Sequence, residues 1–274
     1  MLTALAGALG PLGYKRGGAM AMDADAAAFI AAAGISDATQ SSAVNTLTTA
    51  LKSASLWSKL KAAYPFVGGS AAAHKWNLKD PRDLDAAFRL GFSGTWTHDA
   101  NGIQGNASTA YANTFLSPST VLSASSGCYG VYSRSAASAL STWYDMAAGA
   151  GASLGTILIC RYSNGNAYWC YGEGSSFVYN TTVADGSGLF ACNRQNGTYT
   201  EGWRNGVKVG QGPSTPSLHA APLFIGAYNG NGSAARHSGR PYAFAFVSDG
   251  LSDAESAALY SAVQAFQTTL GRQV

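Results

Sequence analysis

Charged side chains are scarce in this sequence. Only 11% of its 274 residues are Asp, Glu, Lys or Arg, whereas an average soluble domain has roughly 25%. The formal net charge is +3, and the longest basic run is Lys15-Arg16. Because a nucleic-acid-binding protein needs a basic face that replaces counterions, the sequence predicts no nucleic-acid partner.

Cysteine is also rare, and its spacing is not that of a metal site. The four cysteines are Cys128, Cys160, Cys170 and Cys192. They form no Cys-x-x-Cys motif and no histidine cluster lies near them, so we predict no metal and no cofactor. A two-residue loop in the turn after Cys160 would place it opposite Trp169, and a three-residue loop would place it opposite Cys170. Nothing marks the chain as secreted, so we expect free, buried thiols.

Glutamate is the rarest residue of all. The three glutamates are Glu173, Glu201 and Glu255. None lies within four residues of another, whereas a glycoside hydrolase needs two carboxylates that flank the scissile bond. The densest acidic group is Asp80, Asp83 and Asp85. Pro81 interrupts this group, and Arg82 and Arg89 are near enough in sequence to pair with it, so we interpret it as a surface or structural feature.

Motifs for nucleophilic catalysis and for phosphate binding are missing as well. The sequence has no Gly-x-Ser-x-Gly elbow, and its histidines are scattered. The glycine-rich stretch 226–232 is followed by neither a helix pattern nor a Lys-Ser/Thr pair, so it is not a phosphate loop. We therefore predict that the protein is not an enzyme.

Long apolar runs are absent. The apolar stretch Met1–Leu12 precedes Lys15-Arg16, the reverse of a secretory signal. It is also shorter than the roughly 20 residues of a membrane helix, so we predict no membrane insertion. We interpret residues 1–22 as an arm, or alternatively as a frayed terminus. The arm's predicted contacts with a neighbouring subunit are Leu2, Leu5, Leu9 and Leu12, which are spaced as one helical stripe.

Residues 23–64 have a helical pattern. Asp23 is a predicted N-cap, and Gly34 is the predicted end of the first helix. Ser36 or Asp37 opens a second helix, in which apolar residues recur at intervals of three and four. A third, short helix is predicted around Leu56 to Leu60, and it ends near Tyr64-Pro65. This small helical segment is expected to pack on the rest of the chain.

From Pro65 the periodicity changes to two. The predicted strands are 86–92, 128–133, 156–162, 175–180, 198–204, 222–227 and 242–247. Turn pairs such as Asn164-Gly165, Asn205-Gly206 and Asn229-Gly230 separate them, which indicates an antiparallel sandwich or barrel. Asn205-Gly206 predicts a type I′ hairpin, because both of its central residues take positive φ.

The chain closes with one strongly patterned helix. Ser252 and Glu255 have the spacing of a capping box. The apolar stripe of this helix consists of Leu259, Val263, Phe266 and Leu270. We expect this stripe to lie against the β-sandwich.

Three segments near the end resemble a known fold. GWRNGVKV, PLFIGAYNGNG and YAFAFVSDGLSDAESAALY are similar to the final strands of concanavalin A-like lectin/glucanase and laminin G-like jelly rolls. The resemblance implies a mainly β protein in which residues 65–274 form an antiparallel jelly-roll β-sandwich ending in a helix. The N-terminal helical segment would precede this domain.

A longer pattern resembles a family of proteins from tailed bacteriophages and prophages. AAYPFVGGSAAAHKWNLKDPRDLDAAFRLGFSG together with VQAFQTTLGRQV carries the resemblance, which spans Asp23–Val274. It implies a tail- or head-associated virion component, made in the host bacterial cytoplasm. Its expected partners are other virion proteins, and we expect a homo-oligomer within the particle.

Two stretches have the composition of a sugar-binding loop, with an aromatic ring beside amides. The candidate glycan-binding residues are Tyr228, Asn229, Asn231, Tyr162 and Asn164. The alternative is that both stretches are plain turns. The leading interpretation is thus a non-enzymatic virion component attached through its N-terminal region, with a module that recognises host surface glycans second and a glycoside hydrolase last.

Overall fold

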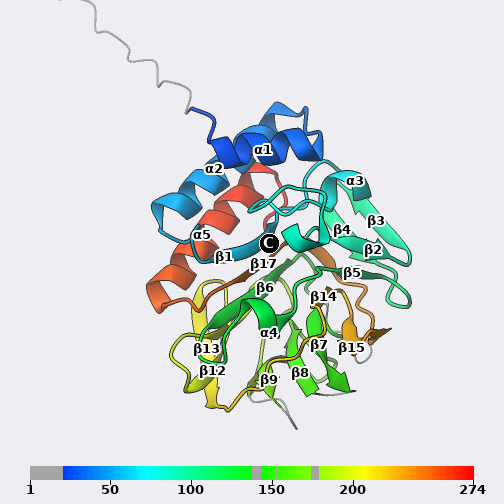
Figure 1. Ribbon diagram of the computed structural model, residues 1–274, viewed down its shortest axis with the longest axis vertical. Coiled ribbons are helices and arrows are strands. Elements are labelled where there is room, and N and C mark those ends of the chain that lie inside the picture. Colours follow the sequence, from blue (N-terminus) through cyan, green and yellow to red (C-terminus); the bar gives the residue numbers. More distant parts are fainter. Residues whose placement is uncertain (1–20, 138–142, 152–153, 174–178) are drawn as a thin grey trace, which may run out of the picture.

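The computed structural model describes residues 21–137, 143–151, 154–173 and 179–274. It shows a mainly β protein in which two sheets, antiparallel except for one strand pair, form a sandwich with helices packed against one side (Figure 1). This confirms the predicted jelly-roll class. The arm residues Leu2, Leu5, Leu9 and Leu12 lie outside the described part of the chain.

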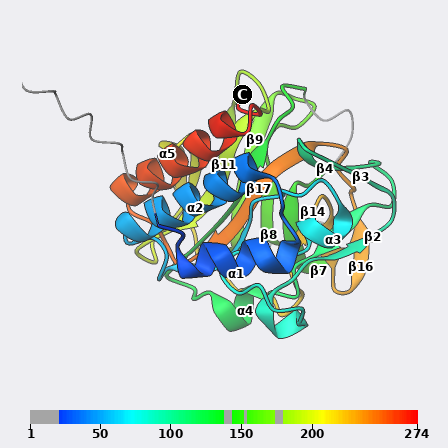
Figure 2. The same cartoon turned by 90° about the horizontal axis from the view of Figure 1, so that it is seen from above.

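Three helices form a layer of their own. These three are α1 (Ala24–Ala33), α2 (Ala38–Ser53) and α5 (Asp253–Thr269). The shorter helices are α3 (Ala71–His74), η1 (Asp85–Ala87) and α4 (Pro118–Val121). Figure 2 shows α1, α2 and α5 side by side over one sheet. Within the described ranges, no helix is both long and apolar enough to cross a membrane.

The predicted helix ends are confirmed. The Asp23 side chain accepts hydrogen bonds from the backbone N–H groups of Asp25 and Ala26, and Gly34 ends α1 in the left-handed conformation. Asp37, rather than Ser36, caps α2. The capping box predicted at the start of α5 is present with both of its hydrogen bonds. These caps satisfy N–H groups that the first helical turn leaves without partners.

The first sheet lies in the middle of the molecule, and we call it the inner sheet. Its strands, in spatial order, are β13 (Val207–Pro213), β12 (Tyr199–Arg204), β11 (Gly188–Arg194), β6 (Gly127–Ser133), β17 (Pro241–Ser248), β4 (Gly102–Gly105) and β3 (Trp96–Asp99), with β1 (Leu60–Tyr64) also paired to β17. Along β17, Phe244 and Phe246 pack under the helices, while Ala245 and Val247 enter the sandwich interior. Side chains of a strand alternate between its two sides. Both sides of β17 are buried, because the helices cover one and the sandwich interior the other.

The second sheet, the outer sheet, closes the sandwich. Its strands, in spatial order, are β10 (Tyr179–Thr182), β9 (Asn166–Glu173), β8 (Leu154–Ile159), β7 (Met146–Gly151), β14 (Phe224–Ile225), β5 (Tyr111–Asn113) and β2 (Gly91–Ser93), with β15 (Tyr228–Gly230) on β7 and β16 (Ser233–Ala235) on β15. The predicted strand 86–92 is only partly correct, because η1 and a left-handed Phe88 interrupt it before β2.

The predicted third helix is wrong. Residues 60–64 form strand β1, which pairs with β17 in antiparallel orientation. Ala63 packs under the helices, whereas Ala62 and Tyr64 face the sandwich interior. Burial on both sides and the hydrogen bonds to β17 stabilise the strand. The helix was predicted because this partner lies far away in sequence.

The hairpin predicted at Asn205-Gly206 is confirmed. It joins β12 and β13, and its two central residues have φ values of 51° and 74°, as a type I′ turn requires. The turn is packed on α5: a Cβ atom added to Gly206 would lie 2.8 Å from Cβ of Tyr260. The hairpin therefore also fixes where α5 rests.

The structure has all four cysteines as thiols outside any disulfide, and all four are buried, as predicted. Both predicted registers for Cys160 are wrong, since Leu158 lies opposite Trp169 and Ile157 lies opposite Cys170. Beyond the end of β8, the backbone N–H of Tyr162 donates to the oxygen of Asn166 at 2.7 Å and closes the hairpin. Cys160 faces the sandwich interior, while Cys170 belongs to a cluster on the other face of the outer sheet.

Candidate functional site

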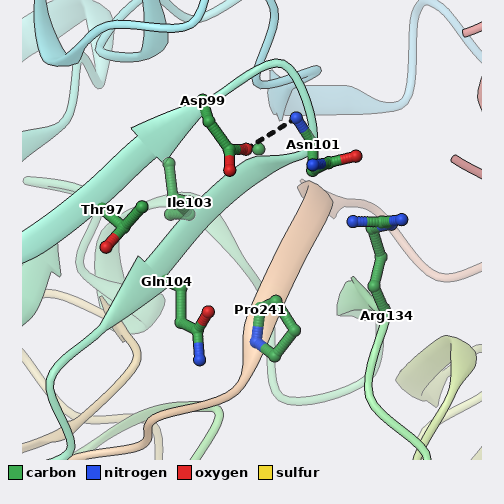
Figure 3. A pocket seen from close by; sticks show the side chains of 8 residues that line it. Thr97, Asp99, Asn101, Ile103, Gln104, Arg134 and Pro241 are labelled. Carbon is green, nitrogen blue, oxygen red and sulfur yellow. Dashed lines mark hydrogen bonds between the residues drawn. The ribbon is translucent and has the colours of Figure 1, made fainter.

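Two adjoining hollows open where strands of both sheets begin or end. The smaller has a volume of about 170 Å³, and the larger about 650 Å³. They share Gln104, Arg134 and Pro241, so we treat them as one site, the arginine groove. In Figure 3 the smaller hollow lies between the β3–β4 hairpin, which carries Thr97, Asp99, Asn101, Ile103 and Gln104, and the side that carries Arg134.

The larger hollow is built from five chain segments. It is lined by Gln104, Arg134, Ser135, Ala136, Ala137, Trp143, Arg161, Gly239, Arg240 and Pro241. These residues follow β6, precede β7, follow β8 and lead into β17, apart from Gln104 in β4. Since β6 and β17 are antiparallel neighbours, as are β7 and β8, the end of one strand and the start of the next lie at the same edge.

One buried side chain holds these segments together beneath the groove. The guanidinium group of Arg240 donates to the backbone oxygens of Ser135 (3.2 Å), Ala137 (2.7 Å) and Arg161 (2.9 Å). Its Nε lies 3.2 Å from Oδ1 of Asp145, and the two side chains are only 2% and 1% exposed. The inner-sheet and outer-sheet walls of the groove are thus joined through Arg240.

Asp145 is the acceptor at the centre of this network. Its Oδ1 accepts from the hydroxyl groups of Tyr242 (2.6 Å) and Ser238 (3.0 Å), and its Oδ2 accepts from the backbone N–H of Cys160 (2.7 Å). Burial, followed by the charge of Asp145, raises the pKa of Tyr242 well above its usual value. The network is a closed structural unit, and Asp145 neutralises the charge of Arg240.

Two further arginines form the walls of the groove, and both are partly exposed. Arg134 donates from Nε to the backbone oxygen of Arg272 at 3.0 Å. In the described ranges, the Arg161 side chain makes one long contact, 3.5 Å from Nη1 to the oxygen of Ala136, and its buried Nε has no hydrogen-bond partner. Among the described residues, neither Arg134 nor Arg161 forms an ion pair with a carboxylate.

An aromatic ring and an amide complete the lining. The Trp143 side chain is partly exposed in the larger hollow. The exposed Gln104 donates from Nε2 to the oxygen of Gly239 at 3.0 Å, which leaves its Oε1 directed to no described partner. At the far end, Oδ1 of Asp99 accepts from the backbone N–H of Asn101 at 2.7 Å (Figure 3).

The structure buries two of the predicted glycan-binding residues. Tyr228 and Asn229 are each 1% exposed. The Asn229 side chain donates to the oxygen of Pro222 and accepts from the N–H of Gly232, so its role is structural. The turn predicted at Asn229-Gly230 lies two residues later, at the exposed Asn231 and Gly232, because residues 228–230 form strand β15.

The other predicted stretch lies beside the groove. Tyr162 and Asn164 are at the surface and follow directly on Arg161. Asn164 donates to the Tyr168 hydroxyl at 2.6 Å and accepts from the backbone N–H of Asn166. Asn164 thus serves as a turn residue, as the alternative interpretation proposed, while the nearby Arg161 lines the groove.

No metal centre is evident in the part of the chain that the structure describes, where no group of three or more His, Cys, Asp or Glu side chains could hold an ion. The acidic group near residue 80 is paired, as predicted. Arg82 binds Asp80 at 2.5 Å, Lys75 binds Asp83 at 2.6 Å, and Arg89 binds Asp85 at 2.7 Å. A hydrogen bond from Lys75 lowers the pKa of Asp83, which stabilises its charged form.

Comparison with known proteins supports the fold. No family model matches the chain, and no curated protein matches its sequence. A Trypanosoma rangeli sialidase mutant displaying trans-sialidase activity is similar in structure, with a TM-score of 0.50, 10% identity, and coverage of 80% of this chain and 39% of that one. A weaker likeness is to domain 4 of AbnA, a GH43 extracellular arabinanase from Geobacillus stearothermophilus in complex with arabinotriose. Its TM-score is 0.47 at 14% identity, with 73% of this chain and 98% of that one covered. Another is to the receptor binding domain of a botulinum neurotoxin C/D mosaic serotype, with a TM-score of 0.46, 11% identity, and coverage of 75% of this chain and 51% of that one. The chain spans well under two thirds of the sialidase, and what the likeness shows is a β-sandwich fold.

Proposed function

We propose that the protein is a non-enzymatic glycan-binding component of a phage particle, and that the arginine groove is its binding site. The observation that carries the proposal is the lining of the larger hollow, where Trp143, Arg134, Arg161 and Gln104 converge. An aromatic ring stacks on the apolar face of a sugar, while guanidinium and amide groups bond its hydroxyls. A volume of about 650 Å³ is in the range of small-molecule sites.

The lining of the groove favours binding over hydrolysis. Among the described residues that line the two hollows, Asp99 is the one carboxylate. Asp145 is buried beneath the lining. Glycoside hydrolysis commonly uses two carboxylates about 5–10 Å apart across the bond that is cut. A second group of this kind is not supplied by the described lining, so a glycoside hydrolase remains the least favoured alternative.

The virion assignment rests on the sequence resemblance over Asp23–Val274. Helices α1, α2 and α5 cover one side of the molecule (Figure 1), and the lining of the groove comes from other segments. In this proposal the N-terminal region attaches the protein to other virion proteins in a homo-oligomeric appendage. The groove would then contact glycans of the host surface.

A glycan array tests the binding function. We expect the wild-type protein to bind defined glycans and Trp143→Ala to bind them at least about tenfold more weakly, because aromatic anchors dominate such sites. Trp76→Ala is the matched control, since Trp76 is also partly exposed but packs near the helices. Wild-type protein that bound no glycan, or equal binding by both variants, would contradict the proposal.

Attachment to the particle is tested separately. We expect gold-labelled antibodies to mark intact particles at the sites of one appendage. A chain that starts at Asp23 should fold with an unchanged circular dichroism spectrum and yet be missing from the particles, because the predicted arm is removed. Incorporation of this shortened chain at wild-type occupancy would move the attachment surface to the helices or the sandwich.

A further inference from the structure

We infer that the arginine groove selects glycans that carry an acidic group, an inference that rests on the proposed glycan-binding function. The larger hollow has three arginines in its lining and no acidic residue. Positive charge that faces an open hollow attracts an anion, and planar guanidinium groups match carboxylate and phosphate oxygens in geometry.

Not all of this charge is available to a ligand. Arg240 is buried, bound to Asp145, and engaged with three backbone oxygens. Its role is to hold the walls in place. Arg134 and Arg161 are different, because they are partly exposed and have no carboxylate partner among the described residues.

Asp185, an acidic side chain that interacts electrostatically with Arg161, does not cancel the charge of Arg161. Burial raises the pKa of Asp185, but hydrogen bonds from Ser187 and then the charges of Arg204 and Arg161 outweigh it, so the pKa is lowered. The carboxylate is thus within electrostatic reach of Arg161. Asp185 is, however, bound to Arg204 at 2.6 Å and accepts two hydrogen bonds from Ser187. Within the part of the chain that the structure describes, the guanidinium of Arg161 also has few contacts, since its Nε has no partner there and its Nη1 contact is 3.5 Å long.

Asp99 makes the two ends of the groove differ in charge. It is exposed in the smaller hollow, on the other side of the shared Arg134 from Trp143 and Arg161. A negatively charged ligand group is repelled from the Asp99 end and attracted to the Arg161 end. The acidic group of the glycan would therefore lie between Arg134 and Arg161, with a sugar ring against Trp143 and neutral hydroxyls toward Gln104.

The shared chemistry of the ligand is an oxyanion on a sugar. It can be the carboxylate of a hexuronic acid or a phosphate of a phosphorylated glycan, because an arginine binds either one through paired N–H donors. An array that prints neutral, carboxylated and phosphorylated versions of the same oligosaccharides separates these sources. The matched neutral form of a uronic acid is its methyl ester, which keeps every hydroxyl.

The experiment compares wild-type protein with Arg134→Gln, Arg161→Gln and Arg161→Lys. We expect acidic glycans to bind at least tenfold more tightly than their neutral forms, with the advantage falling as salt is raised. Each Gln variant should lose this advantage, and Arg161→Lys should keep part of it because charge remains without the fork. Arg82→Gln is the control, since Arg82 is exposed and paired with Asp80 elsewhere.

The outcomes separate this inference from the proposed function. Binding to neutral glycans with no preference for acidic ones, lost in Trp143→Ala, would overturn the inference and leave the glycan site intact. Acidic preference that survived in both Gln variants would place the anion elsewhere and also overturn it. If no printed glycan bound at all, both the site and its preference would fall together. Melting curves of the variants confirm that each remains folded.

Discussion

Replacing Asp145 with Ala is expected to lower the free energy of unfolding by about 3–5 kcal/mol, the usual result of removing one partner from a buried ion pair. The variant would leave the guanidinium of Arg240 buried without a counter-charge. It would also leave the hydroxyl groups of Tyr242 and Ser238 and the N–H of Cys160 without their acceptor. Urea denaturation followed by circular dichroism measures the change.

Two further variants make this test specific. Asp83→Ala removes an exposed carboxylate from the Lys75 pair, and it should leave the free energy of unfolding nearly unchanged. Asp145→Ala combined with Arg240→Met removes both buried charges, and it should be more stable than Asp145→Ala alone. If the single variant Asp145→Ala unfolded at the wild-type urea concentration, the network beneath the groove would not be what holds its walls.

Gly206→Val is expected to destabilise the protein by at least about 2 kcal/mol. A β-branched residue at a φ of 74° is strained by roughly 1–3 kcal/mol. Overpacking adds about 1–3 kcal/mol more, because the new Cβ would lie 2.8 Å from Cβ of Tyr260 and 3.0 Å from Cα of Ala257. Thermal melting of the purified variant measures the combined effect.

Gly165→Val is the matched control for this variant. Gly165 is also the second residue of an Asn-Gly pair, with a φ of 86°, but an added Cβ meets nothing within 4 Å. It therefore reports the backbone strain alone, and the difference between the two variants reports the contact between hairpin and helix. Equal losses of stability would show that the packing of the turn on α5 contributes nothing, and a Gly206→Val protein with wild-type stability would contradict the type I′ assignment.

Local features of the fold are predictable from the sequence because their causes are local. The N-cap at Asp23, the stop at Gly34 and the hairpin at Asn205-Gly206 each depend on residues within a few positions of one another. The two-residue alternation after Pro65 likewise indicates strands wherever one face of the sheet is buried. These signals were sufficient for the class of fold.

Strand β1 shows where such reasoning fails. Leu56, Trp57 and Leu60 have spacings that suit a helix, and proline after Tyr64 suits a helix end. What makes residues 60–64 a strand is the neighbouring β17, whose hydrogen bonds and side chains cover it. No pattern near residue 60 reveals a partner that lies in residues 241–248.

The arginine groove cannot be predicted from the sequence for the same reason. Arg134, Trp143 and Arg161 each stand alone in sequence, without a motif, and they meet because strands of two sheets end at one edge. One sequence feature does point to Arg161: it directly precedes Tyr162, where a ring beside amides has the composition of a sugar-binding loop. Tyr228 and Asn229 show the converse, because a ring beside an amide also suits a buried strand.

The position of Arg272 determines when the fold can be completed. Its guanidinium group binds the backbone oxygens of Pro65 and Phe66, which lie 207 and 206 residues earlier, and β17 pairs with β1 across a similar separation. On the ribosome, residues 60–66 have no hydrogen-bonding partner of this kind until β17 and Arg272 have emerged. The domain therefore acquires its native core only after Arg272 has emerged, and its long-range pairings make it a slow folder among domains of its size.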